Sequence, residues 1–153
     1  MVSEFKKRQT HDFFRDITSI GSLWFYVTAV AFFIAIRQIS MGIELAFGLA
    51  MIYLIVVIVR TIYFKERPTK YPYNSYLERL DASSFPSLHA ARIIFLGAVL
   101  MHEFQDVSFS IFSIFVMTIV SYSRIKLKKH DNFDVFAGWI VGVIVFFLAR
   151  IIF

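Results

Sequence analysis

The chain has 153 residues, of which 58% are hydrophobic and only 18% are charged, below the roughly 25% of an average soluble domain. A soluble domain of this length cannot bury so much apolar surface, and a disordered chain would be far more polar. The net charge of +5 suits an anionic partner, and the lack of Cys excludes disulfides and thiolate chemistry. The composition therefore predicts an integral membrane protein.

The predicted elements begin with an amphipathic segment at residues 1–17, where Phe5, Phe13 and Phe14 alternate with charges at roughly helical spacing. This pattern is typical of a helix that lies on the membrane surface, and a solvated tail is the alternative. Five apolar stretches follow, each close to the ~20 residues that a spanning helix needs. They lie near residues 19–36, 42–59, 90–104, 107–122 and 135–153.

Lipid offers no water to the backbone, so these stretches are expected to be helical. We expect a single domain over residues 1–153, an all-α integral membrane protein: a bundle of about five transmembrane helices with an N-terminal amphipathic interfacial helix. Five spans place the N-terminus and the charged loops 60–87 and 123–134 on one face. Thirteen of the 16 Lys and Arg residues lie there, where they suit lipid phosphates better than nucleic acid.

Residues that suit phosphate chemistry lie where these loops meet the spans. Pro86 is placed to open a helix, with Ser87, Leu88 and His89 in its first turn. The free N–H groups and the helix dipole of such a turn attract phosphate. A simple helix start is the alternative.

The second loop ends in a His–Asp pair. His130 and Asp134 are four residues apart and share one helix face, so the carboxylate can hold one imidazole nitrogen and leave the other as nucleophile or base. A surface pair is the alternative, and Arg124 taken alone fits an interfacial anchor. Because two of the four His fall at junctions on the same face, we favour a site.

Together these motifs resemble the type 2 phosphatidic acid phosphatases, or lipid phosphate phosphatases. That family's pattern is Lys, six residues, Arg-Pro; then Pro-Ser-Gly-His; then Ser-Arg, five residues, His, three residues, Asp. The matching positions are Arg67-Pro68, then Pro86, Ser87 and His89, then Ser123-Arg124, His130 and Asp134. Arg60 replaces the Lys and keeps the positive charge. Leu88 replaces the Gly and keeps the backbone N–H. The resemblance covers the chain from about residue 60 onward.

The resemblance implies a phosphohistidine mechanism. His130 would be the nucleophile, Asp134 would orient it, and His89 would act first as general acid and then as general base. Other groups would hold the phosphoryl oxygens: Arg60, Arg67, Arg124, Ser87 and the N–H of Leu88. Because three guanidiniums supply the positive charge, neither a metal nor another cofactor is expected.

Arg92 lies one helical turn after His89, just inside a span. Two interpretations stay open. It contacts a second phosphate or a lipid headgroup, or it pairs with Glu44 or another acidic group.

The resemblance also implies a set of candidate substrates, and the motifs do not distinguish among them. An isoprenoid diphosphate, phosphatidylglycerol phosphate, phosphatidic acid and the 1-phosphate of lipid A are the candidates. The expected partners are this lipid phosphate and membrane lipids, with no nucleic acid and no obligate protein partner. A non-catalytic lipid-phosphate binder or transporter is the alternative, although binding alone needs neither His89 nor a His130–Asp134 pair. A vanadate-dependent peroxidase would share the site, but five spans argue against it.

Location follows from the same resemblance. It implies the cytoplasmic membrane of a prokaryote, with the active site on the extracytoplasmic face. The loop charges favour the opposite orientation, because ten basic residues outside the motifs lie on the site face and two lie on the other.

Overall fold

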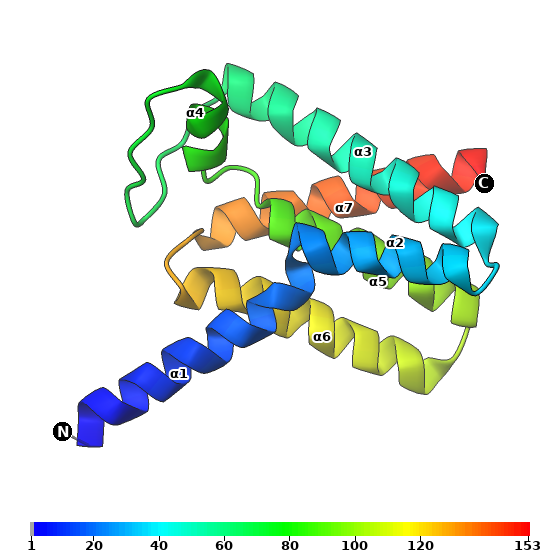
Figure 1. Ribbon diagram of the computed structural model, residues 1–153, viewed down its shortest axis with the longest axis horizontal. Coiled ribbons are helices and arrows are strands. Elements are labelled where there is room, and N and C mark those ends of the chain that lie inside the picture. The colour runs from blue at the N-terminus through cyan, green and yellow to red at the C-terminus, as the bar shows by residue number, and fades with distance from the viewer. Residues whose placement is uncertain (1) are drawn as a thin grey trace.

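The computed structural model describes residues 2–153, which form helices and connecting loops with no β-sheet (Figure 1). The predicted all-α class is confirmed. In chain order the elements are α1 (Val2–Thr18), the 3-10 turn η1 (Ser19–Gly21), α2 (Leu23–Ala35), α3 (Ile39–Ile62), α4 (Tyr76–Ala82), α5 (Leu88–Phe104), α6 (Val107–Lys126) and α7 (Asn132–Ile152).

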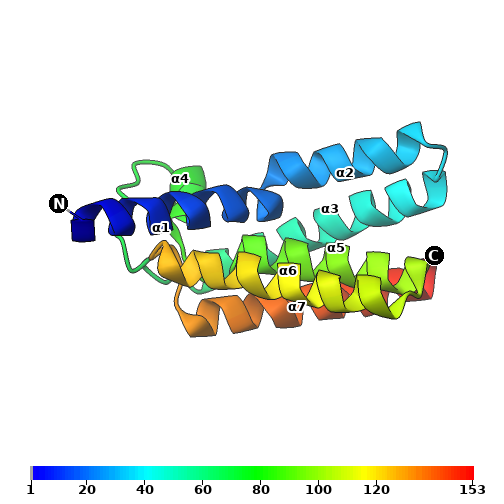
Figure 2. The ribbon, with the colours of Figure 1, turned by 90° about the horizontal axis from the view of Figure 1, so that it is seen from below.

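The long helices form a bundle, and its two ends carry different loops (Figures 1 and 2). Helix α5 packs against α3, α6 and α7, and α2 packs against α3. The loop that carries α4 and the loop between α6 and α7 lie at the same end, opposite the C-terminus (Figure 1). The motif residues of both loops therefore meet at one end of the bundle, as the topology predicted.

The helices differ in their ability to cross a membrane. Helices α3, α6 and α7 are each long and apolar enough, and α1 with α2 would supply a fourth span if the bent pair crosses as one unit. Helix α2 has 13 residues and α5 has 17, below the ~20 that a span needs. Length and composition therefore support three or four spans in residues 4–153, against about five expected.

The N-terminal segment is helical, as its amphipathic pattern predicted. It bends by 43° into α2 and packs along α6, where the Phe14 ring meets Tyr122 edge-on at 5.8 Å. Thr18, at its end, accepts a hydrogen bond from Arg124 at 3.0 Å. Helix α1 is thus joined to the bundle beside the motif residues, and its place in the membrane interface stays a prediction.

Glycines on α7 allow it to approach α5 closely. A Cβ atom at Gly138 would lie 2.5 Å from the carbonyl oxygen of Ser87, and one at Gly142 would lie 2.6 Å from that of Ala91. Small residues of this kind let membrane helices pack backbone against backbone. The approach brings the start of α7 to the start of α5, where the N–H of Ser87 donates to the carbonyl of Asp134 at 3.0 Å.

Candidate active site

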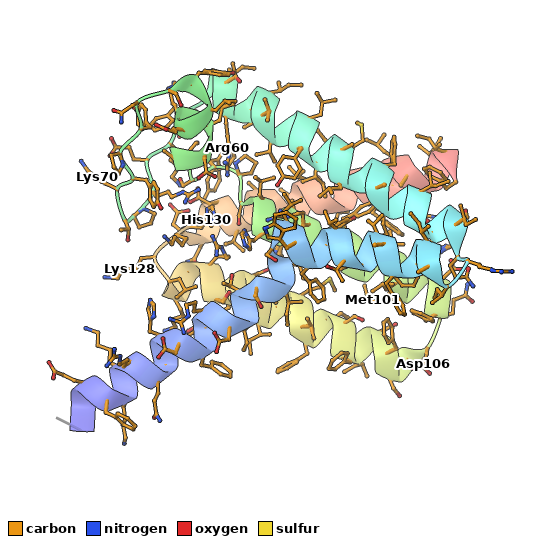
Figure 3. The ribbon with its side chains drawn as sticks, in the orientation of Figure 1. Arg60, Lys70, Met101, Asp106, Lys128 and His130 are labelled. Atoms are coloured by element: carbon orange, nitrogen blue, oxygen red, sulfur yellow. The ribbon has the colours of Figure 1, made fainter. Side chains whose placement is uncertain are left out.

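The motif residues converge on one pocket at the loop end of the bundle, where Figure 3 labels Arg60 and His130. The cavity has a volume of ≈ 250 Å³. Its walls come from the α2 start, α3, α4 and its loop, α5, α6 and the α6–α7 loop: Ser22, Leu23, Tyr53, Arg60, Arg67, Asp81, Leu88, His89, Arg92, Arg124 and His130. The two remaining predicted residues, Ser87 and Asp134, are fully buried and bond to each other through their backbones.

The backbone of the loop before α5 fixes the orientation of His130. Its Nδ1 lies 2.7 Å from the carbonyl oxygen of Ser84, and a carbonyl only accepts, so the proton is on Nδ1. Nε2 then carries the lone pair that a nucleophile needs. The nearest Asp134 oxygen is 3.7 Å from Nδ1. Ser84 is therefore the direct partner that we did not foresee, and Asp134 acts at that distance through its charge.

Asp134 is held by several donors at once. It forms a capping box with Asp131, in which its own Oδ2 accepts the backbone N–H of Asp131 at 3.1 Å. The ammonium of Lys65 donates to Asp134 at 2.7 Å and to Asp131 at 2.6 Å. Lys65 is one of the thirteen basic residues on the site face, which we expected to suit lipid phosphates. The contact with Asp134 joins positions 69 residues apart, so sequence spacing does not indicate it. The one signal in the sequence is that Lys65 stands two residues before Arg67.

The surroundings of His130 and Lys65, which both lie in loops, set the charges of these two side chains. Burial lowers the pKa of His130, and the nearby guanidiniums of Arg124 and Arg67 add to this, although Asp134 opposes it. His130 is therefore neutral at ordinary pH, which leaves its lone pair available. Burial alone would lower the pKa of Lys65, but the hydrogen bonds and charges of Asp131 and Asp134 outweigh it, so its pKa is raised. The ammonium stays charged.

Arg60 joins the site to its scaffold. Its two terminal nitrogens donate to the carbonyls of Leu80 at 2.8 Å and Pro86 at 3.0 Å. These bonds fix the end of α4 and the residue before the α5 cap. Arg60 thus holds backbone as well as lining the pocket, a role that the motif spacing did not indicate.

Arg67 and Arg124 are also anchored by acceptors in the protein. Arg67 donates to the carbonyl of Asp81, and Arg124 donates to the hydroxyl of Thr18. In the part of the chain that the structure describes, the buried side-chain nitrogens and oxygens without a partner are the Nε atoms of four arginines: Arg60, Arg67, Arg92 and Arg124. Buried donors are rarely left unpaired. All four arginines line the same cavity, so it is suited to an anion.

His89 and Arg92 form the far wall of the pocket. Arg92 donates to Nδ1 of His89 at 3.3 Å and to the hydroxyl of Tyr53 at 3.2 Å. Glu44, the acidic partner that we considered for Arg92, instead accepts from Arg150 at 3.2 Å. The ion-pair interpretation with Glu44 is therefore wrong.

Helix α5 begins two residues after Pro86, the residue that we expected to open it. Ser87 is its N-cap and accepts the N–H of Ala90 at 3.4 Å, so Leu88 is the first helical residue. The non-glycine residues with positive φ among those described are Arg37, Gln105 and Lys128. Leu88 therefore needs no conformation reserved for glycine, and its N–H, like that of His89, has no carbonyl acceptor within the helix.

Comparison with known proteins identifies the family. A sequence profile described as the PAP2 superfamily matches residues 41–153. The chain belongs to the PAP2 superfamily. It is accordingly a membrane hydrolase, a phosphatase that acts on lipid phosphates, and the resemblance drawn from the three motifs is confirmed.

The fold of this PAP2 protein is similar to that of LpxE from Aquifex aeolicus. The two share 21% identity with a TM-score of 0.78, over 93% of this chain and 86% of that chain. No curated protein matches the sequence significantly. Residues 4–153 contain no cluster of three His, Asp or Glu side chains arranged to hold a metal ion.

Proposed function

We propose that this PAP2 protein removes the terminal phosphate of a membrane lipid phosphate or diphosphate through a covalent intermediate on Nε2 of His130. One observation carries the proposal: Ser84 holds the proton on Nδ1 of a buried His130 that lines a pocket of guanidiniums. A pure binding site has no need of an imidazole held as a nucleophile beside a second histidine.

The first step transfers the phosphoryl group to the enzyme. Nε2 of His130 forms a bond to phosphorus while the bond from phosphorus to the leaving oxygen breaks. His89, in its cationic form beside the bound anion, gives that oxygen a proton and becomes neutral. The charge that spreads over the phosphoryl oxygens meets the guanidiniums of Arg60, Arg67 and Arg124. The imidazole becomes cationic in this step, and the buried carboxylate of Asp134 stabilises it from 3.7 Å.

The second step releases phosphate. His89 takes a proton from water, the water oxygen bonds to phosphorus, and the bond from phosphorus to Nε2 of His130 breaks. The guanidiniums that stabilised the first step also stabilise the second, so the chain's own cations supply the charge that a metal ion gives in other phosphatases.

A lipid substrate also needs a place for its chain. An apolar hollow of ≈ 310 Å³ opens between α2, α5 and α6. Its walls include Ile20, Phe25, Ile93, Leu96, Phe112 and Val116. A hydrocarbon chain would bury apolar surface there while its phosphate enters the polar pocket.

Trapping the intermediate tests the proposal. The His89→Ala variant, mixed with lipid substrate, should accumulate an acid-labile phosphoryl group on the peptide that contains His130, as read by mass spectrometry at alkaline pH. The His89→Ala/His130→Ala double variant is the matched control and should accumulate none. A binding or transport protein would leave both variants unmodified.

We further propose that the site faces the outside of a prokaryotic cytoplasmic membrane, as the family resemblance implies. Lys70 is 85% exposed, so Lys70→Cys is a suitable reporter in a chain without Cys. An impermeant thiol reagent should label it in intact cells. Labelling only after the cytoplasmic side is opened would reverse the orientation, as the loop charges favour.

A further inference from the structure

We infer that the pocket contains a second phosphate subsite, formed by Arg92 and Tyr53, and that the preferred substrate is therefore a lipid diphosphate. The inference rests on the proposed phosphatase function and names its substrate class. Neither residue belongs to the three motifs that hold the transferring phosphoryl group.

Arg92 is a buried cation without a counter-ion among the residues that the structure describes. Its residue is 3% exposed, its Nε has no partner, and within residues 4–153 no carboxylate oxygen lies within 4.0 Å of it. Burying a charge without a partner is costly, and that cost is offset when a ligand brings the opposite charge. The two bonds that Arg92 does make, to neutral Tyr53 and to His89, supply no negative charge.

The charge of the whole pocket matches a diphosphate. Its lining holds four arginines and one acidic residue, Asp81, a net of three positive charges. Three of the arginines belong to the motifs, and in the proposed mechanism they hold the transferring phosphoryl group. A fully ionised lipid diphosphate carries three negative charges and a lipid monophosphate two, so the fourth guanidinium accommodates the additional charge.

The position of Arg92 specifies which phosphate it meets. His89 serves the leaving oxygen, and Arg92 touches its ring at 3.3 Å. In a diphosphate that oxygen bridges to the second phosphorus, whose free oxygens then lie beside Arg92. Tyr53 accepts from Arg92 with its oxygen, so its hydroxyl proton is free to donate to the same phosphate.

The reaction step balances with this assignment. The bond from Nε2 of His130 forms at the terminal phosphorus, and the bond from that phosphorus to the bridging oxygen breaks. The bridging oxygen departs with the electron pair as part of a lipid monophosphate. Arg92 and Tyr53 then stabilise the charge that develops on this leaving group.

A matched pair of substrates tests the inference. Farnesyl diphosphate and farnesyl monophosphate share one chain and differ by one phosphate, and phosphate release gives kcat/KM for each. The wild type should favour the diphosphate. Arg92→Gln should lower kcat/KM by about 10- to 100-fold for the diphosphate and by about 3-fold or less for the monophosphate. Arg37→Gln, at the far end of the bundle, should change neither.

Other outcomes separate the claims. Equal losses on both substrates in Arg92→Gln would overturn the subsite and make Arg92 a support for His89. Hydrolysis of neither substrate by the wild type would overturn the proposed function as well. If Arg92→Gln does not fold, imidodiphosphate decides the matter with the wild type. It should inhibit farnesyl monophosphate hydrolysis at a concentration at least 10-fold lower than inorganic phosphate does, and equal inhibition would overturn the subsite.

Discussion

Replacing Lys65 with Met tests how the nucleophile is held. The ammonium donates to the carboxylates of Asp131 and Asp134 at 2.6 and 2.7 Å, and Asp134 is fully buried. Hydrogen bonds between charged groups contribute about 1.5–3 kcal/mol each, and removing one partner of a buried ion pair costs about 3–5 kcal/mol. Because the Lys65 side chain is 25% exposed, water recovers part of this, and we expect a loss of about 2–4 kcal/mol.

Thermal unfolding in detergent, followed by circular dichroism, measures this loss. It corresponds to a fall in Tm of about 5–15 °C. The matched control is Lys70→Met, because Lys70 is 85% exposed and its pairing with Glu66 at 3.5 Å contributes about 1 kcal/mol or less. Lys65→Arg keeps the charge and should restore most of the stability.

The same variant should lose phosphatase activity. Without Lys65, the Asp134 carboxylate is free to leave the position from which it stabilises the phosphorylated imidazole, and we expect kcat to fall at least 10-fold. The pKa of Lys65 is raised, so its contribution to stability is full below its ordinary value of about 10.4 and is lost only as the pH rises through the raised value. If Lys65→Met matched Lys70→Met in Tm and in kcat, the positioning role would be refuted.

Three further predictions concern the pocket and its scaffold. The pKa of His130 is lowered, so nucleophilic activity should persist below pH ~6.5 and fall only as the pH drops through the depressed value, which the acid limb of kcat/KM against pH measures. Its contribution to stability is likewise present above ~6.5 and lost on the same descent. Arg60→Lys can satisfy one of the two carbonyls that Arg60 binds, so thermal unfolding should show a loss of about 1–3 kcal/mol. Gly138→Ala places a methyl group 2.5 Å from the carbonyl of Ser87, which should cost about 1–3 kcal/mol and lower activity, and an unchanged Tm would show that α5 and α7 separate freely.

Sequence patterns predicted the parts of this protein that depend on local spacing. The apolar stretches indicated the helices, and the motif intervals predicted that His89, Arg124 and His130 lie in one pocket. The predicted start of α5 was two residues early, because a Ser N-cap and a Pro in the first turn both produce a plausible start.

The contacts that the sequence could not indicate involve backbone groups or distant loops. The carbonyl of Ser84 orients His130 across 46 positions, and any residue type would present the same carbonyl. Lys65 and Tyr53 reach their partners across 69 and 39 positions, with no periodicity to link them. The apolar pattern also did not predict the number of spans. Helix α5 is packed among other helices, so its length is not set by the lipid alone.

The most direct test of the central claim is phosphate release in detergent micelles. The wild type and His130→Ala are compared with EDTA present, on an isoprenoid diphosphate, phosphatidylglycerol phosphate, phosphatidic acid and the 1-phosphate of lipid A. We predict release by the wild type that EDTA does not reduce, with the fastest release from the diphosphate, and none by His130→Ala. Release that His130→Ala retains, or that EDTA abolishes, would contradict a histidine nucleophile served by the chain's own cations.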